Sequence, residues 1–234
     1  MPIKDYINNT KKFHDKKYLS KGYNFQRKFP NEDVIRFENK FLKKSSKILD
    51  IGCGTGRNVT YLIKKKHTVH CLDFSNHAIN LLKKLLKKKK LNKSKYKLII
   101  DSIPKMKKVN DNYDAIIDCF TSYALIKKDF EIYIENIYKR LKKSGVLHLQ
   151  ILSKKSDLFK KSYPSKKIFT NSLNKILRKT SPFFGDDYLF TFYLRKEIKK
   201  ILCKNFKNVN IETNSRTYRN SKEYFEYFVI DCKK

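Results

Sequence analysis

Three glycines at alternate positions follow an apolar run that contains an aspartate, in the segment Ile48-Leu49-Asp50-Ile51-Gly52-Cys53-Gly54-Thr55-Gly56-Arg57-Asn58-Val59. The run before the glycines is typical of a buried strand, and the apolar residues from Tyr61 to Ile63 have helical spacing. Because glycine lacks a Cβ and tolerates positive φ, a ligand can approach the backbone of such a loop closely. The amides that open the helix favour a carboxylate, phosphate or ribose oxygen. The segment therefore predicts a strand, a tight loop and a helix that together bind a polar ligand.

The spacing of the glycines separates two classes of cofactor. The dinucleotide fingerprint G-x-G-x-x-G requires its third glycine at position 57, where this chain has Arg57 instead. The pattern D-x-G-x-G-x-G, with Asp50 ending the strand, resembles the first motif of the class I S-adenosylmethionine (SAM)-dependent methyltransferases. The resemblance covers about residues 47–152 and implies SAM as the cofactor. A glycine turn that binds no ligand is the structural alternative.

Strand and helix patterns alternate on both sides of this loop. Strands are expected at 48–51, 68–72, 96–100, 113–120, 146–152, 207–213 and 224–232. The alternation predicts an α/β fold with a doubly wound, mostly parallel seven-stranded sheet, helices on both faces and a C-terminal antiparallel hairpin. We expect a single domain over residues 1–234. Its expected parts are an N-terminal helical cap (1–46), a cofactor-binding core (47–152), a substrate-side insertion (153–190) and a C-terminal helix with edge strands (191–234).

Acidic residues recur where the predicted strands end. Asp50, Asp73, Asp101 and Asp118 all fall at or near these ends, in a chain with 22 acidic residues. The carboxyl ends of parallel strands share one edge of a sheet, where open α/β folds bind ligands. A carboxylate at position 73 can accept hydrogen bonds from both ribose hydroxyls. The resemblance implies that Asp101 reaches the adenine amino group, with the backbone amide of Ser102 near a ring nitrogen.

The residues expected to bind the cofactor come from the glycine loop, the strand ends and the N-terminal cap. They are Asp50, Gly52, Cys53, Gly54, Gly56, Asn58, Asp73, Phe74, Asp101, Ser102, Asp118, Cys119, Phe120 and Arg27. In the cap, Tyr18, Tyr23, Phe25 and Arg27 are expected to fold over the cofactor. The equally strong alternative is that these aromatic residues pack the cap onto the sheet.

Methyl transfer from sulfur is an in-line displacement on an activated group, so alignment of the reactants supplies most of the catalysis. A general base is needed only when the acceptor must lose a proton. The candidates for that base are His148, Asp186, Asp187 and His14, and none is assigned. His148 could equally be satisfied within the sheet, and the two aspartates could be a helix cap or loop surface. Gln150 could contact an acceptor.

The composition bears on the kind of acceptor. The formal net charge is +33, which favours weak binding to nucleic acid. However, only 8 of the 55 basic residues are arginine, the residue expected where bases or phosphates are read specifically. Methyltransferases of base amino groups usually carry Asp or Asn before Pro-Pro, whereas this chain has Asp118-Cys119-Phe120-Thr121. The Pro-Cys nucleophile of cytosine C5 enzymes is absent as well. A cap-type RNA methyltransferase, whose aromatic segment distantly resembles Phe120 to Tyr123, stays open as an alternative.

The five cysteines are widely spaced, with no histidine at metal-ligand spacing, so we expect reduced thiols and no metal site. No apolar run approaches the roughly 18 residues of a membrane span, and the segment after Met1 lacks the apolar core of a signal peptide. We therefore expect a cytoplasmic SAM-dependent methyltransferase that acts on N or O of a small-molecule acceptor. Nothing in the sequence indicates its oligomeric state.

Overall fold

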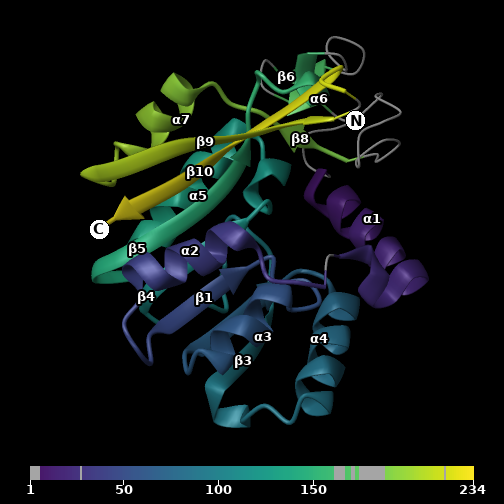
Figure 1. The fold of residues 1–234 in the computed structure, drawn as a ribbon, viewed down its shortest axis with the longest axis vertical. Helices are drawn as coiled ribbons and strands as arrows, with labels where there is room; N and C mark the ends of the chain where they lie inside the picture. Colours follow the sequence, from purple (N-terminus) through teal and green to yellow (C-terminus); the bar gives the residue numbers. More distant parts are fainter. Residues whose placement is uncertain (1–5, 27, 161–166, 170–171, 174–187, 219) are drawn as a thin grey trace.

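The chain folds around a seven-stranded sheet in the order β3-β2-β1-β4-β5-β10-β9 (Figure 1). The computed structural model describes residues 6–26, 28–160, 167–169, 172–173, 188–218 and 220–234. The strands of this sheet are β1 (Lys47–Ile51), β2 (Thr68–Asp73), β3 (Tyr96–Ile100), β4 (Tyr113–Cys119), β5 (Leu141–Leu152), β9 (Asn208–Tyr218) and β10 (Glu223–Lys233). The first five pair in parallel, and β10 pairs antiparallel with both β5 and β9. This order confirms the predicted doubly wound sheet with a C-terminal antiparallel hairpin.

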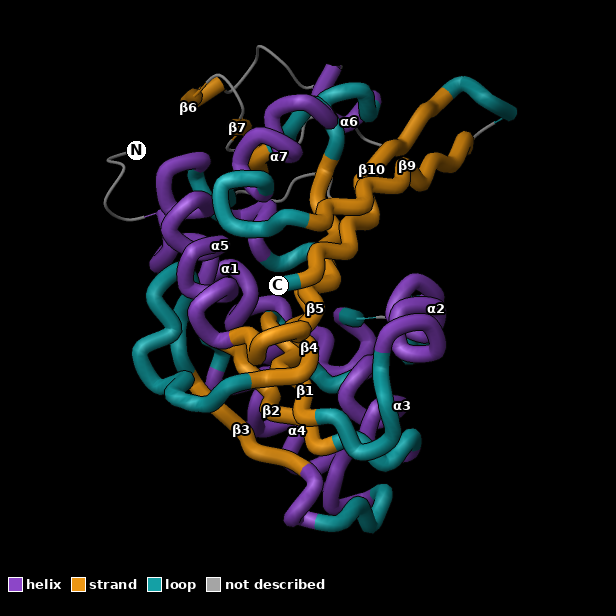
Figure 2. Tube along the Cα trace, turned by 90° about the vertical axis from the view of Figure 1, so that its left-hand side faces the viewer, coloured by secondary structure: helices purple, strands orange, loops and turns teal. Residues whose placement is uncertain are grey.

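Helices cover both faces of the sheet. They are α1 (Tyr6–Lys21), α2 (Glu32–Phe41), α3 (Arg57–Lys64), α4 (Asn76–Lys88), α5 (Lys127–Arg140), α6 (Asp157–Lys160) and α7 (Arg195–Leu202), with short 3-10 helices η2 (Gly22–Phe25), η3 (Lys93–Lys95) and η4 (Ser122–Ala124). In Figure 2, α2 and α3 lie on one side of the sheet, and α1, α5 and α7 lie on the other.

Alternation along the strands creates two buried apolar layers. Ile48 of β1 packs into a cluster with Val34 of α2 and Leu62 of α3, whereas its neighbour Leu49 packs into a second cluster with Ile134 of α5 and Ile198 of α7. Successive side chains of a strand point to opposite faces, so one apolar run supplies both layers.

Local sequence signals set where several elements begin. The Asn31 side chain accepts a hydrogen bond from the Asp33 amide at the start of α2, and the Ser75 side chain accepts one from the Ala78 amide at the start of α4. Such side chains satisfy backbone N–H groups that have no partner inside the helix. Strand β5 begins at Leu141, earlier than expected, because Leu141 pairs with Tyr113 across a register shift before regular pairing resumes.

The predicted insertion at 153–190 is described only in part. It contains α6 and a small antiparallel sheet of β6 (Lys167–Phe169), β7 (Ser172–Leu173) and β8 (Phe190–Thr191). Residues 161–166, 170–171 and 174–187 lie outside the described part of the chain. Across the described residues, the helices are too short or too polar to cross a membrane.

Candidate functional site

The glycine loop connects β1 to α3 as predicted. Gly52, Gly54 and Gly56 have φ values of 66°, 53° and 87°, a region that L-residues with a Cβ rarely adopt. The amides of Gly52 and Cys53 both donate to the carbonyl oxygen of Leu72 on β2, at 2.8 and 3.0 Å. The loop is therefore tied to the carboxyl end of the neighbouring strand, where the predicted ribose-binding carboxylate also lies.

Gln26, which follows η2, lies directly over the loop. A Cβ added to Gly54 would come within 2.1 Å of the Gln26 amide nitrogen. Gln26 Oε1 accepts hydrogen bonds from the backbone amide and the hydroxyl of Thr55, at 2.9 and 3.1 Å, and Gln26 Nε2 donates to the Tyr18 hydroxyl at 2.8 Å. The loop amides were expected to face a ligand, but the Thr55 amide is already bonded to the cap. Gln26 was not among the predicted site residues, although its neighbours Phe25 and Arg27 were expected over the cofactor.

The cap is held on the loop side by further contacts. Asp15 of α1 accepts a hydrogen bond from the Ser75 hydroxyl, and the Tyr23 hydroxyl donates to the carbonyl oxygen of Leu81 on α4 at 2.7 Å. Tyr18 is buried, at 4% exposure. The N-terminal segment therefore packs onto the loop and α4 and closes one side of the site.

Asp73, at the end of β2, links the loop to its own strand. Its Oδ2 accepts from the Gly54 amide and its Oδ1 from the Ser75 amide, both at 2.9 Å. Each carboxylate oxygen has a second lone pair that these bonds leave available. Burial raises the pKa of Asp73 to about 6, against the lowering effect of the backbone hydrogen bonds. The carboxylate is thus fixed in orientation and can accept further donors.

Asp101 follows β3 at the same edge of the sheet. Its Oδ1 accepts from the Ser102 amide at 2.8 Å, and its Oδ2 accepts from the Lys108 amide at 2.7 Å. The expectation that the Ser102 amide reaches a ligand is not met in this geometry, because that N–H already donates to Asp101. The Asp101 carboxylate still lines the cavity described next.

A cavity of about 120 Å³ lies between the strand ends and the cap. Its lining includes Gly52, Asp73, Phe74, Asp101, Cys119 and Phe120, all predicted from the sequence to bind the cofactor. The remaining lining residues come from the cap, the strand ends and the segments after β3 and β4: Ile7, Thr10, His14, Tyr18, Gln26, Ile51, Leu72, Ile103, Thr121, Tyr123, Ala124 and Leu125. The cap residues Thr10, His14 and Tyr18 recur at helical i, i+4 spacing, a signal that would have grouped them.

Five further predicted cofactor residues, Asp50, Cys53, Gly54, Gly56 and Asn58, are not part of the described lining. Cys53 and Asp50 are buried, Gly54 is covered by Gln26, and Gly56 packs against Leu82. The Asn58 side chain accepts a hydrogen bond from the Asn31 amide at 3.0 Å and so joins α3 to α2.

Asp118 differs most from its expected role. It is fully buried and accepts hydrogen bonds from the amides of Thr121 and Ser122 and from the Tyr133 hydroxyl of α5. Its carboxylate therefore organises the turn after β4 on the α5 side of the sheet. The neighbouring Cys119, the last residue of β4, lines the cavity.

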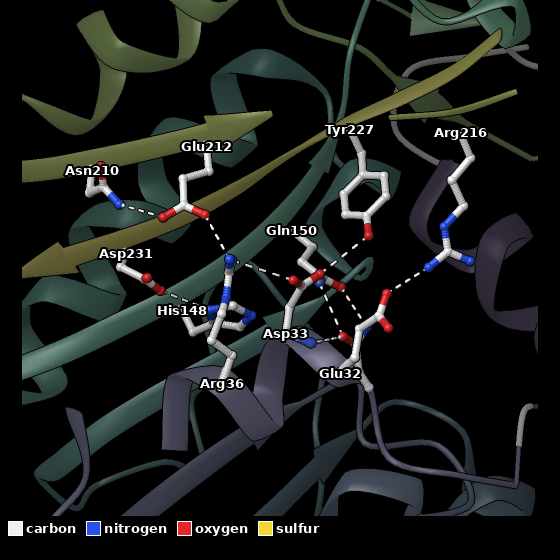
Figure 3. Close-up of polar contacts among 11 residues, drawn as sticks. Glu32, Asp33, Arg36, His148, Gln150, Asn210, Glu212, Arg216, Tyr227 and Asp231 are labelled. Carbon is white, nitrogen blue, oxygen red and sulfur yellow. Dashed lines mark hydrogen bonds and ion pairs between the residues drawn. The ribbon is translucent and has the colours of Figure 1, made fainter. Parts of the chain in front are cut away.

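His148 is buried under α2, away from the cavity. Its Nδ1 lies 2.8 Å from Asp231 of β10, its ring packs on Phe37 at 4.9 Å between centroids, and it is 1% exposed (Figure 3). His148 is therefore a residue enclosed within the sheet, and it is not positioned to act as a general base. Two further candidates, Asp186 and Asp187, lie outside the described residues, as does Arg27, and the fourth candidate, His14, lines the cavity.

Gln150 belongs to the same buried polar cluster. It donates to Asp33 Oδ2 at 2.6 Å and accepts from the Asn31 side chain at 2.9 Å, and the Tyr227 hydroxyl donates to Asp33 at 3.2 Å (Figure 3). Gln150 is completely buried. Its contacts therefore attach the start of α2 to the sheet, and an acceptor does not reach it in this arrangement.

Asp50 has an unsatisfied oxygen. Within the described part of the chain its Oδ2 has no hydrogen-bond partner. Burial raises the pKa of Asp50 to about 7. The positive charge of Arg57 opposes this rise, and the negative charges of Asp118 and Asp73 add to it. An acid whose pKa is higher in the folded than in the unfolded protein makes stability fall as pH rises between the two values, here between about 4 and 7.

We expect Asp50→Asn to stabilise the free protein at pH 8 by about 2–4 kcal/mol, because it removes the buried charge. Urea unfolding should show this gain shrinking as the pH falls toward 4. The control is Asp111→Asn, because an ion pair with Lys47 at 2.7 Å lowers the pKa of Asp111, so that change should cost stability at pH 8. A gain in Asp50→Asn that does not vary with pH would contradict the role of charge.

Comparison with known proteins agrees with this architecture. Residues 49–147 match the family described as "Methyltransferase domain". O-methyltransferase 3 of Dictyostelium discoideum is 26% identical over 214 residues, which are 86% of this chain and 48% of that protein. The chain thus spans about half the length of this curated relative.

Two solved structures share the fold. A SAM-dependent methyltransferase from Methanosarcina mazei superimposes with a TM-score of 0.69 at 20% identity, over 88% of this chain and 99% of that one. The 1,6-didemethyltoxoflavin-N1-methyltransferase of Burkholderia thailandensis, solved with S-adenosylhomocysteine, gives a TM-score of 0.70 at 12% identity. The superposition covers 100% of this chain and 91% of that one. The chain therefore shares the Rossmann-like fold of these solved methyltransferases, and residues 49–147 are similar to the methyltransferase domain family.

Proposed function

We propose that this protein transfers the methyl group of SAM to an oxygen or nitrogen of a small-molecule acceptor. The observation that carries the proposal is the cavity at the carboxyl ends of β1, β2 and β4, which the glycine loop, Asp73 and the cap enclose together. Ligands of open α/β folds bind at this edge of the sheet. The family relationship and the O-methyltransferase relative support the reaction class.

The residues around the cavity fit SAM, which carries an adenosine, an amino acid group and a sulfonium cation. Asp73, a buried carboxylate that lines the cavity, suits the ribose hydroxyls, and Asp101 suits the adenine amino group. The unsatisfied Oδ2 of Asp50 suits a cationic amino group. When bound, SAM supplies a methyl group that is already activated for displacement. The chain's own contribution is to align the acceptor and keep water away.

A small acceptor agrees with the way the cap closes the site. Helix α1 contributes Ile7, Thr10, His14 and Tyr18 to the lining, so the cavity is covered on the side where a polymer would enter. The described lining of the cavity contains no Lys or Arg. The positive charge of the described residues therefore lies outside this lining.

Calorimetry with S-adenosylhomocysteine tests the cofactor part, and we expect micromolar affinity. For the acceptor, methyl-tritiated SAM should label a small-molecule fraction of a cell extract and leave a total RNA fraction unlabelled. We expect RNA binding to decline steeply by about 0.3 M salt, as for simple lysine electrostatics. Saturable RNA binding above that salt concentration, together with labelled RNA, would favour the cap-type alternative.

A further inference from the structure

The hydrogen bonding of His14 defines its tautomer. Nδ1 lies 2.8 Å from the backbone carbonyl oxygen of Thr10, one turn earlier in α1. Because a carbonyl oxygen only accepts, Nδ1 carries the proton and Nε2 carries a lone pair. Within the described residues no hydrogen bond engages Nε2. The ring therefore brings a free basic nitrogen to the same cavity that Asp73 and Phe120 line.

The surroundings of His14 are aromatic. Its ring lies 5.0 to 5.9 Å, between centroids, from the rings of Phe13, Phe25, Phe74 and Tyr188. Burial lowers the pKa of His14 below its ordinary value of 6.5, while the hydrogen bond to Thr10 and the charge of Asp15 oppose that shift. The imidazole is therefore neutral at pH 7 and able to take a proton.

The cavity lining also restricts the acceptor. A chain with 55 Lys and Arg places none of them among the described lining residues, and the side chains beyond the cofactor carboxylates are mainly apolar, such as Ile7, Ile103 and Leu125. A phosphate or carboxylate on the acceptor would lose its hydration here without a cationic partner. A neutral, flat body suits the apolar and aromatic walls.

We propose that His14 is the general base for methylation of a neutral aromatic alcohol, a phenol-type hydroxyl, in this cavity. This inference rests on the proposed function. The acceptor hydroxyl gives its proton to Nε2 of His14, and its oxygen forms the new bond to the methyl carbon. The carbon–sulfur bond of SAM breaks, its electron pair stays on sulfur, and the imidazolium then releases the proton to solvent.

The test uses the protein with methyl-tritiated SAM and 4-methylphenol as the acceptor probe, a simple phenol whose hydroxyl keeps its proton across the assay range. We expect the wild type to form labelled 4-methylanisole, and His14→Asn and His14→Gln each to lower kcat about 100-fold. Asparagine keeps an amide donor for the Thr10 carbonyl and removes the base, so a purely structural role would survive that change. His77→Gln on α4, a histidine outside the cavity lining, should leave turnover unchanged.

Two readouts separate the base from a structural role. The kcat/KM of the wild type should rise with pH through a pKa below 6.5, and this limb should be missing in His14→Asn. Asp15, Tyr18, Asp73 and Tyr188 are also titratable and lie around the ring. The rising limb of the pH profile is therefore assigned to His14 only if it disappears in His14→Asn. Nitrogen NMR of the free protein at pH 7 should show His14 protonated at Nδ1 alone.

The outcomes distinguish this inference from the function on which it rests. A wild type that does not bind S-adenosylhomocysteine would overturn both. Three results would overturn the His14 inference and leave the proposed function standing: full turnover in His14→Asn with normal binding, no methylation of 4-methylphenol, or a proton on Nε2 at pH 7. Normal binding in His14→Asn with turnover lost, and with the pH limb lost, supports it.

Discussion

Replacing Asp73 by alanine is expected to weaken S-adenosylhomocysteine binding about 100-fold or more, because two hydrogen bonds to a charged carboxylate contribute about 1.5–3 kcal/mol each. Calorimetry at pH 8 measures this loss directly. Because burial raises the pKa of Asp73 to about 6, wild-type affinity should also fall as the pH drops below 6, when the carboxylate takes up a proton and loses acceptor capacity.

The variant also removes the acceptor for the Gly54 and Ser75 amides, so part of the loss is expected to come from a less ordered loop. Asp111→Ala provides the control, since this acid precedes β4 at the opposite edge of the sheet and contacts Lys47. It should bind the ligand as the wild type does. Binding that survives in Asp73→Ala would remove the ribose assignment.

Gly52→Ala is expected to lower the free energy of unfolding by about 3 kcal/mol and to abolish ligand binding. Gly52 has a φ of 66°, and an added Cβ would lie 2.0 Å from Thr121 Oγ1. That hydroxyl donates to the carbonyl oxygen of Ile51 at 3.1 Å, so it cannot move away without losing its bond. Urea unfolding and calorimetry measure the two effects.

Gly22→Ala separates backbone strain from the collision. Gly22 also has a positive φ, 51°, but no atom lies within 4 Å of its added Cβ. Strain alone should therefore cost about 1–2 kcal/mol there, with ligand binding retained. Equal destabilisation in the two variants would show that the contact with Thr121 contributes nothing.

Much of the fold follows from patterns within short stretches of the chain. The glycine loop and the strands from β1 to β4 lie where the spacing of residue types predicts them. These features depend on neighbours a few positions apart, and sequence periodicity reports such neighbours directly. The positions of Asp73 and Asp101 at one sheet edge follow from the parallel order.

Hydrogen bonding explains why the predicted site was too broad at Asp118. This residue pairs with Ile51, which lines the cavity, but the turn amides and the Tyr133 hydroxyl occupy its carboxylate. At His148 the reason is the two-residue period of the strand, which turns the ring toward α2. The period was visible in the sequence, but which face carries which helix was not.

Local spacing along the chain was enough to predict the class of fold, the glycine loop and the acids at the strand ends, because it encodes strands, turns and helix starts. Three-dimensional packing alone revealed that Gln26 covers the glycine loop, that His14 reaches the cavity and that His148 does not. Those contacts join side chains far apart along the chain, such as Gln26 with Thr55 and Phe74 with His14. They depend on how α1 and α2 pack on the finished sheet, which no local pattern specifies.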